Sequence, residues 1–316
     1  MSKYEQWKSN PARFLAMTGY NLSQFNELLD CFSEEHQEYF SYHNLKGKPH
    51  KKGFRRFAIY QNSPLPTVED RLVFILSYLK LNPLQEQHAD TFGMGQRQCN
   101  DFVHRLKTVL DKALERHGAM PVATGMELEK VLEERGGEVA PEKQLFHDGT
   151  EREVPRPSDP ELQEENYSGK KKKHTVKNAV VTNMVGLVLL LTCTLAGKTH
   201  DKRMADDNYT VTAGYFLWQD TGYQGYAPEG VTVVQPTKKP RGKELSEGQK
   251  DKNREISSVR VRVEHFIGSI KRMRIVKDEC RLRKEGFVSS IMKTCTGLHN
   301  LRVMMNPFNY PEIKLT

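Results

Sequence analysis

The sequence predicts an all-α domain followed by an α/β domain with a mixed sheet and flanking helices. In the first part of the chain, apolar residues recur at the spacing of helices, as in "NLSQFNELLDCFSEEHQEYF". From "QLFHD" onward the pattern changes to short runs rich in Val, Leu, Thr and aromatic residues, which is typical of strands. A segment punctuated by Gly and Pro, residues 121–143, lies between the two patterns and is interpreted as a linker with one short charged helix inside it.

Composition restricts the class of protein. The chain has 316 residues, with 48 Lys and Arg against 40 Asp and Glu, a formal net charge of +8. A basic excess favours nucleic acid, an anionic membrane surface or acidic partners. The longest apolar run, "LVLLL", is far shorter than the ~20 residues that span a bilayer, and the first residues lack the apolar core of a secretory signal. Scattered cysteines without a CxxC pair argue against a zinc site and for a reducing compartment. We therefore expect a soluble cytoplasmic protein that meets nucleic acid.

The first 65 residues contain aromatic-rich helical patterns and one basic loop. Asn21 or Ser23 is the expected N-cap of the helix that contains Phe25 and Leu28. The segment "KGKPHKKGFRR" is interpreted as an exposed loop. Because "NPARF" and "KPHKKGFRRF" mix basic and aromatic residues, both are candidates for DNA contact. The next helix starts at Pro66 and Thr67, and its nearly all-apolar middle predicts burial.

The stretch "NPLQEQHADTFGMGQRQCNDFVHRLKTVLDKAL" predicts helix, turn and helix. Ala89 is small enough for close packing, and Gly93 suits a turn that needs positive φ. The N-terminal end of the second helix would be the position of a recognition helix that presents side chains to bases. A helical hairpin of any all-α domain has the same pattern, so both interpretations stay open. The candidate base-reading residues are Gln96, Arg97, Gln98 and Asn100.

The second half predicts strands at "QLFHD", "HTVKNAVVTN", "GLVLLLTCTLAG", "YFLWQD" and "VTVVQP", with a hairpin around Asn183–Gly186. Two helices are interleaved, in "THDKRMADDNYTV" and "NREISSVRVRVEHFIGSIKRMRIV". His200 and Asp201 could approach a metal site or cap the first of these helices, and we favour capping. The charged segment 235–253 predicts a mobile surface loop. A last helix places Phe287, Ile291 and Cys295 on one face.

Three carboxylates stand out by position: Asp148 and Asp220 end predicted strands, and Glu264 lies on the long helix. Taken singly, each has an ordinary explanation. An Asp in the turn after a strand is usually turn chemistry. Glu264 falls roughly 130° from the centre of the apolar stripe of its helix. There, an ion pair with Arg260 would stabilise the helix by only ~0.3–0.5 kcal/mol.

Together, the three carboxylates fit a different chemistry. Two aspartates at strand ends and a glutamate on a later helix supply the oxygen ligands that Mg²⁺ prefers. A pair of such ions can activate an attacking oxygen and stabilise a leaving one in phosphoryl transfer. No His or Cys ligands are needed for this site.

The second half resembles the DDE transposases of bacterial insertion sequences, specifically the "insertion sequence five" superfamily. "HDGTEREVPRPSDPELQEENYSGKKKKHTVKN" is similar to the block around the first aspartate of the family, and "DTGYQGY" to the block around the second. "GKTHDKRMADD" resembles the helix after the third strand. "SVRVRVEHFIGSIKRMRIV" resembles the helix with the third acid, although Met273 replaces the Phe of the family. The segment from "LPTVEDRLVFIL" to "LKTVLDKAL" is similar to the preceding helix-turn-helix domain.

This resemblance implies a ribonuclease H-like fold in which Asp148, Asp220 and Glu264 are the DDE triad and bind two Mg²⁺ ions, for which Mn²⁺ can substitute. The expected domains are an α-helical DNA-binding region at 1–120 with a helix-turn-helix at about 66–117, the linker 121–143 and a catalytic domain at 144–277. The segment 278–316 is expected to pack on the catalytic domain. The protein would bind the terminal inverted repeats of its element as a homodimer, cleave the DNA ends and transfer them to a target.

Several cations would then contact DNA phosphates. A charge run such as "GKKKKHTVK" is usually a solvated face, but next to the first acidic block phosphate contact becomes the better interpretation. The predicted set is Lys170, Lys171, Lys172, Lys173, His174, Arg260, Lys271, Arg272 and Arg274. Two alternatives stay open: a non-catalytic sequence-specific DNA-binding regulator derived from a transposase, and a ribonuclease H-like nuclease that only hydrolyses.

Overall fold

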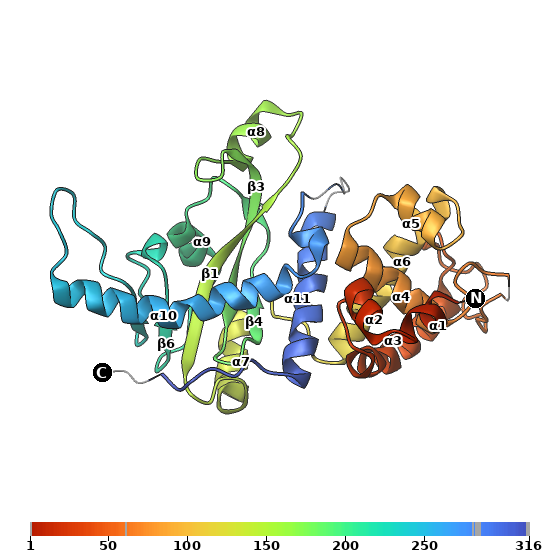
Figure 1. Cartoon of the computed structure of the whole chain (residues 1–316), viewed down its shortest axis with the longest axis horizontal. Coiled ribbons are helices and arrows are strands. Elements are labelled where there is room, and N and C mark those ends of the chain that lie inside the picture. The colour runs from red at the N-terminus through yellow and green to blue at the C-terminus, as the bar shows by residue number, and fades with distance from the viewer. Residues whose placement is uncertain (1, 61, 280, 282–285, 314–316) are drawn as a thin grey trace. The chain divides into compact units, whose positions relative to one another are not determined.

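The computed structural model describes residues 2–60, 62–279, 281 and 286–313. These residues form two compact units. The first contains the N-terminal 120 residues together with Lys271–Asp278 and Ile291–Met305. The second contains Pro121–Ile270 and the remaining described residues of the C-terminal part. Figure 1 labels the elements of both units along the chain.

The N-terminal part of the first unit is all α-helical, as predicted. Polar caps explain where its helices begin, since Asn21 forms a capping box with Gln24 and Thr67 accepts a hydrogen bond from the amide of Asp70. The predicted cap at Asn21 is therefore confirmed. Residues 70–79 are all buried, which confirms the predicted burial of that helix. The elements are α1 Lys3–Lys8, α2 Pro11–Thr18, α3 Leu22–Tyr42, α4 Val68–Leu81, α5 Gln85–Thr91 and α6 Gln96–Arg116.

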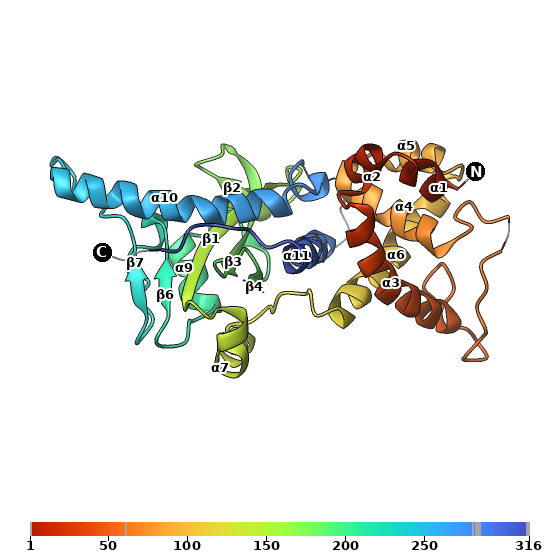
Figure 2. The same cartoon turned by 60° about the horizontal axis from the view of Figure 1, so that its bottom comes forward.

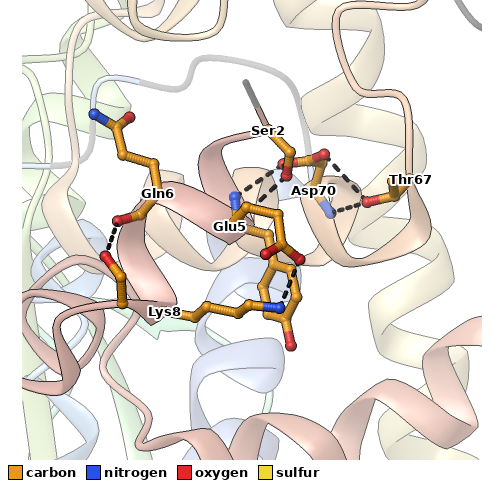
Figure 3. A network of polar contacts seen from close by, with 8 residues as sticks. Ser2, Glu5, Gln6, Lys8, Thr67 and Asp70 are labelled. Carbon is orange, nitrogen blue, oxygen red and sulfur yellow. Dashed lines mark hydrogen bonds and ion pairs between the residues drawn. The ribbon is translucent and has the colours of Figure 1, made fainter.

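A buried carboxylate connects the start of the chain to α4. Asp70 is 1% exposed, so its charge needs polar partners. Its side chain accepts hydrogen bonds from the hydroxyl of Ser2 at 2.8 Å, the amide of Tyr4 at 3.0 Å and the hydroxyl of Thr67 at 3.1 Å (Figure 3). Beside this network, Lys8 pairs with Glu5 at 2.6 Å (Figure 3). Asp70 thus orders the N-terminal helix against α4.

The predicted helix, turn and helix are present as α5, the residues 92–95 and α6. Gly93 has φ of +67°, the backbone conformation that the sequence predicted for the turn. Ala89 is buried, in agreement with its expected packing role. The buried residues of α6 include Cys99, Phe102 and Leu106, which hold this helix against the hydrophobic core of the first unit.

Two segments belong to different units from those predicted from the sequence. The expected linker contains a helix, α7 Gly125–Val139, whose Leu128 and Leu132 belong to the core of the second unit. The second part of α11, Phe287–Met305, packs with the first unit: Thr294 Oγ1 donates to Asp111 at 2.6 Å, and Asn300 donates to the carbonyl of Ala119 at 3.0 Å. The prediction that the segment 278–316 packs on the catalytic domain is therefore wrong for residues 291–305.

The second unit contains a seven-stranded sheet with the order β2-β3-β1-β6-β7, in which β4 and β5 also pair with β3. The pairs that include β3 are antiparallel, whereas β1–β6 and β6–β7 are parallel. This mixed sheet with flanking helices confirms the predicted ribonuclease H-like fold. The strands are β1 Gln144–Glu153, β2 Tyr167–Ser168, β3 Lys173–Thr182, β4 Val188–Leu191, β5 Leu195–Ala196, β6 Phe216–Trp218 and β7 Thr232–Val234.

Helices cover both faces of this sheet. Leu145 and Leu217 face a core shared with α7 and with Met204 of α9, Asp201–Asn208. Because successive residues of a strand alternate between faces, Phe146 and Trp218 lie on the other side. There, Phe266 of α10, Glu247–Ile270, packs against Phe146 with ring centroids 6.4 Å apart. Both views show α10 running along this face of the sheet (Figures 1 and 2).

The long helix α10 begins earlier than predicted. Its first turn lies inside the charged segment that the sequence analysis assigned to a mobile loop. Ser246 accepts a hydrogen bond from the amide of Gln249, whose side chain accepts one from the amide of Ser246. This reciprocal capping explains the early start and corrects the loop prediction. The remaining helices are α8, Pro160–Asn166, and the 3-10 turns η1 Thr221–Tyr223 and η2 Arg274–Val276. No helix within the described residues is long and apolar enough to cross a membrane.

Gly186→Ala is expected to loosen the packing of α10 on the sheet. A Cβ atom at Gly186 would lie 2.8 Å from atoms of both Phe266 and Phe308, and φ is +90°. Gly214 is the matched control, since its φ is +86° but its nearest neighbour is a side-chain atom 4.0 Å away. We expect Gly186→Ala to lower the free energy of unfolding by about 1–2 kcal/mol more than Gly214→Ala, measured by urea denaturation. Equal losses would contradict this packing.

Candidate active site

The register of β1 and β6 brings two of the three predicted carboxylates together. Phe146 pairs with Trp218 in parallel register, and each aspartate lies two residues further along its chain. Residues two apart share a face, and neighbouring strands are ~4.8 Å apart, so Asp148 and Asp220 emerge side by side on the face that α10 covers. Each carboxylate accepts a hydrogen bond from the amide of the following residue at 2.7 Å.

A buried histidine fixes this register from the opposite face. His147 precedes Asp148, and its Nε2 lies 2.9 Å from Oε1 of Gln219, which precedes Asp220. Nδ1 lies 2.8 Å from the hydroxyl of Tyr209. Burial lowers the pKa of His147 to about 3, so the ring is neutral and carries one proton. Because the amide nitrogen of Gln219 donates to the carbonyl of Tyr226, the proton is assigned to Nε2, which donates to Gln219.

The pKa of Asp148 is raised to about 6, first by burial and then by the nearby charges of Asp220 and Asp201. The guanidinium of Arg260 acts in the opposite direction and lowers this pKa. Arg260 belongs to α10, is buried and places Nη1 3.5 Å from Oδ1 of Asp220. The two aspartates therefore share one internal cation, and their combined negative charge is only partly compensated.

Glu264 lies on the same helix but is exposed. It follows Arg260 by four residues, so the two side chains are neighbours on one side of α10. Arg260 nevertheless pairs with Asp220. The ordinary explanation of Glu264, an ion pair with Arg260, is therefore not observed. Within the part of the chain that the structure describes, no group of three His, Cys, Asp or Glu side chains is close enough to hold a metal ion. The structure thus brings together two of the three predicted ligands.

The aspartate pair fits a hard divalent cation such as Mg²⁺. Both donors are carboxylate oxygens, the ligand type that Mg²⁺ prefers, and few protein ligands are needed because this ion retains water and phosphate oxygens. The two carboxylates share the positive charge of Arg260, which leaves the site short of positive charge, and burial raises the pKa of Asp148. A cation between them would supply that charge.

A third acidic residue, Asp201, lies close to the backbone that follows each aspartate, in β1 and in η1. The carboxylate of Asp201 lies so close to Gly149 and Gly222 that a Cβ atom would be 3.2 and 3.0 Å away, respectively. Asp201 pairs with Lys177 at 3.3 Å, and Lys177 pairs with Glu151 at 3.1 Å. His200 is the N-cap residue of α9, one of the two expected, but its side chain makes no cap hydrogen bond, and Asp201 lies in the first turn.

The candidate base-reading residues lie where the sequence placed them, in the first turns of α6. The side chains of Gln96, Arg97 and Gln98 are exposed. Asn100 differs, because it is half-buried and donates a hydrogen bond to Gln85 of α5 at 3.2 Å. Asn100 therefore holds the two helices together, and the three exposed residues are those free to face DNA.

The basic run is remote from Asp148 along the sheet. Lys170, Lys171 and Lys172 lie in the turn between β2 and β3, beyond the end of β1. β1 reaches this end five residues after Asp148, which corresponds to roughly 17 Å. Lys173 pairs with Glu153 at 2.8 Å, and the half-buried ring of His174 contacts Tyr167. Adjacency to the first aspartate in sequence is therefore not adjacency in the fold.

The cations after α10 belong to the first unit by their contacts. Lys271, Arg272 and Arg274 lie in the segment 271–278. The carbonyl of Arg272 accepts a hydrogen bond from Lys80 at 3.0 Å, and Arg274 pairs with Asp278 at 3.0 Å. The side chain of Arg272 is exposed.

Comparisons with known proteins agree with this arrangement. Residues 147–300, which include Asp148, Asp220 and Glu264, match the family described as DDE superfamily endonuclease. Residues 63–116, which include the helix-turn-helix, match the family described as helix-turn-helix of DDE superfamily endonuclease. Both matched segments are therefore similar to DDE superfamily endonucleases. It is also similar to a protein of Microchaete diplosiphon described as "Probable transposase for insertion sequence element IS702", with 24% identity over 287 residues that cover 90% of this chain and 93% of the relative. No solved structure matches the chain.

Asp148→Asn is expected to stabilise the metal-free protein at neutral pH. The folded state raises the pKa of Asp148 from 3.8 to about 6, so it binds this proton more tightly than the unfolded chain. The stability contributed by the proton is fully present below about pH 4 and is lost as the pH rises through 6. The free energy of unfolding of the variant minus that of wild type should increase by about 2–3 kcal/mol between pH 4 and 7, measured by urea denaturation with a chelator. A difference independent of pH would contradict the raised pKa.

Proposed function

We propose that the protein is a transposase that binds the terminal inverted repeats of its own element and catalyses metal-dependent cleavage and strand transfer of the DNA ends. The observation that supports this most is the parallel register of β1 and β6 in a ribonuclease H-like sheet, with Asp148 in β1 and Asp220 two residues beyond the end of β6. The same chain carries a helix-turn-helix ahead of that sheet. The transposase similarity over 90% of the chain agrees with this proposal.

Asp148 and Asp220 would hold divalent metal, with Mg²⁺ as the expected ion and Mn²⁺ as a substitute, and Glu264 would complete the ligand set of a second ion. A bound pair of ions activates the attacking oxygen and stabilises the leaving oxygen of a phosphodiester. Glu264 is the reasonable third ligand because it is an exposed carboxylate one helical turn beyond Arg260, the residue that reaches Asp220.

The other residues of the site would position these groups and the DNA. Arg260 neutralises Asp220 and is the cation best placed to contact the phosphate that reacts there. The neutral ring of His147, bonded to Gln219, holds the two aspartates in register. Lys271 and Arg272, which follow α10 in sequence, are proposed to bind phosphates further along the DNA, as is the basic run 170–174 at the tip of the sheet.

DNA ends would be selected by the helix-turn-helix. Arg97 can form a bidentate pair with guanine, and Gln96 and Gln98 can pair with adenine, if α6 lies in the major groove. Because one active site does not readily serve two element ends, we propose a homodimer on paired ends. Its place of action would be the cytoplasm, on nucleoid DNA.

A second candidate is a DNA-binding regulator without nuclease activity. One observation favours it: the described residues contain no group of three metal-ligating side chains, because Glu264 stands apart from the aspartates. This candidate and the transposase both predict sequence-specific binding through α6. They differ in whether the bound DNA is cut.

Glu264→Gln is expected to abolish cleavage while DNA binding is retained. The substrate is a labelled duplex with the element end, read from the DNA that flanks the gene, together with Mg²⁺ and a target duplex. Because loss of a metal ligand removes charge stabilisation of several kcal/mol, nicking and joining should fall at least about 100-fold. Glu255→Gln is the matched control, since Glu255 is an exposed glutamate of the same helix, and it should cut like wild type.

Two other results would change the assignment. If Glu264→Gln cuts as fast as wild type, Glu264 is not a metal ligand and the triad is wrong. If wild type and both variants bind the end and none cuts it with Mg²⁺ or Mn²⁺, the regulator replaces the transposase.

A further inference from the structure

A second basic surface lies in the first unit, outside the helix-turn-helix. We call residues 46–56 the basic arm. It contains six cations, and from Tyr39 to Val68 the chain has no Asp or Glu. All six cations are exposed, and none of them forms an ion pair within the described residues. They are Lys46, Lys48, Lys51, Lys52, Arg55 and Arg56.

The backbone of the basic arm is anchored to the end of α3. The amide of His50 donates to the carbonyl of Tyr42, and the amide of Arg55 donates to the carbonyl of Ser41, both at 2.8 Å. Directly after the arm, the ring of Phe57 stacks on Phe40 with centroids 5.2 Å apart. A solvated charge run needs no such anchors. The arm instead combines an anchored main chain with cationic side chains that have no carboxylate partner among the residues that the structure describes.

The basic arm also adjoins the recognition end of α6. Arg55 and Arg56 line a cavity of about 580 Å³ whose lining includes Gln98 and Phe102 of α6. Gly47 packs so closely on the guanidinium of Arg105, also on α6, that a Cβ atom would lie 2.4 Å from it. The arm thus flanks the turns of α6 that carry Gln96, Arg97 and Gln98, and both surfaces belong to one compact unit.

This arrangement points to DNA phosphates as the missing partner. Six like charges on a short ordered segment repel one another, and this repulsion is relieved when a polyanion is bound. A helix that enters the major groove has a phosphate backbone on each side of it. The Lys and Arg side chains of the arm are exposed. They are therefore suited to contact the phosphate backbone rather than to read bases.

We propose that the basic arm binds the phosphate backbone that borders the major groove read by α6. The inference rests on the proposed DNA binding but assigns a new surface, since the arm precedes the helix-turn-helix match at 63–116. The arm supplies affinity that does not depend on sequence, whereas Arg97 and its neighbours supply the specificity. Each cation that neutralises one phosphate contributes about −0.9 to the slope of log K against log salt concentration.

The test measures binding of two duplexes, one with the element end and one scrambled, by fluorescence anisotropy between 50 and 300 mM NaCl without divalent metal. In the arm variant, Lys51, Lys52, Arg55 and Arg56 are changed to Gln. We expect the salt slope to become shallower by about 2–4 and the affinity near 150 mM NaCl to fall about 10-fold or more, equally for both duplexes. The preference for the element end should be unchanged. Circular dichroism and thermal unfolding check that the variant is folded.

The matched control removes the same net charge elsewhere. Lys8, Lys130, Lys250 and Arg254 each have a carboxylate partner three or four residues away, and all four are changed to Gln. The arm inference is overturned if the arm variant keeps the wild-type slope, or if the control variant loses as much slope. Because the slope is also read on the scrambled duplex, the arm can be confirmed even if wild type shows no preference for the element end, a result that would contradict the proposed end recognition alone. If wild type binds neither duplex, both proposals are contradicted.

Discussion

The hydrogen bond between His147 and Gln219 is the constraint on which the site depends. It joins the residues that immediately precede Asp148 and Asp220, so it fixes the neighbouring strands in the one register that places both carboxylates side by side. A slip of one residue would turn one aspartate into the core, because side chains alternate between faces. The bond is buried, and leaving either partner unsatisfied would cost about 1–3 kcal/mol. A buried polar pair in the core therefore fixes the positions of Asp148 and Asp220 on the opposite face of the sheet.

The residues on the two faces of the sheet around this hydrogen bond have different roles. On the core side, Tyr209 and Tyr226 complete the network of His147 and Gln219, and Asp201 fills the space left by two glycines beside the aspartates. On the other face, α10 brings Arg260 to Asp220. The guanidinium of Arg260 lowers the pKa of Asp148, but burial raises this pKa more strongly. The site is thus built with an excess of negative charge that a divalent cation can satisfy.

Much of this arrangement could be predicted from the sequence. The positions of Asp148 and Asp220 after apolar strand residues indicated both aspartates, although Asp148 lies within β1 rather than at a strand end. The change from helical spacing to short apolar runs indicated the helical part and the sheet. The predicted helix-turn-helix followed from Ala89 and Gly93, whose conformation and burial agree with it. Local signals also existed where the prediction failed, since the pair Ser246 and Gln249 predicts a helix start inside the charged segment.

Other features depend on contacts between distant parts of the chain. The partner of Arg260 is Asp220, forty residues earlier, rather than the neighbouring Glu264, and no local period could indicate this. In the same way, Lys170–Lys173 follow the first acidic block in sequence, but an antiparallel strand carries them to the far end of the sheet. The role of His147 could not be predicted from the sequence, because a histidine between Phe146 and Asp148 gives no local signal that separates it from other residues of a buried strand. Its partners are 62 and 72 residues away.

The most direct test of the central claim asks whether Asp148 and Asp220 form one cation site. Binding of Mn²⁺ to wild type, Asp148→Asn, Asp220→Asn and the double variant can be followed by electron paramagnetic resonance of the free ion. If the two carboxylates share a cation, each single change should weaken the tightest site at least about 10-fold, and the double change should weaken it little further. Independent, additive losses from the two single changes, or binding by the double variant equal to wild type, would contradict the shared site.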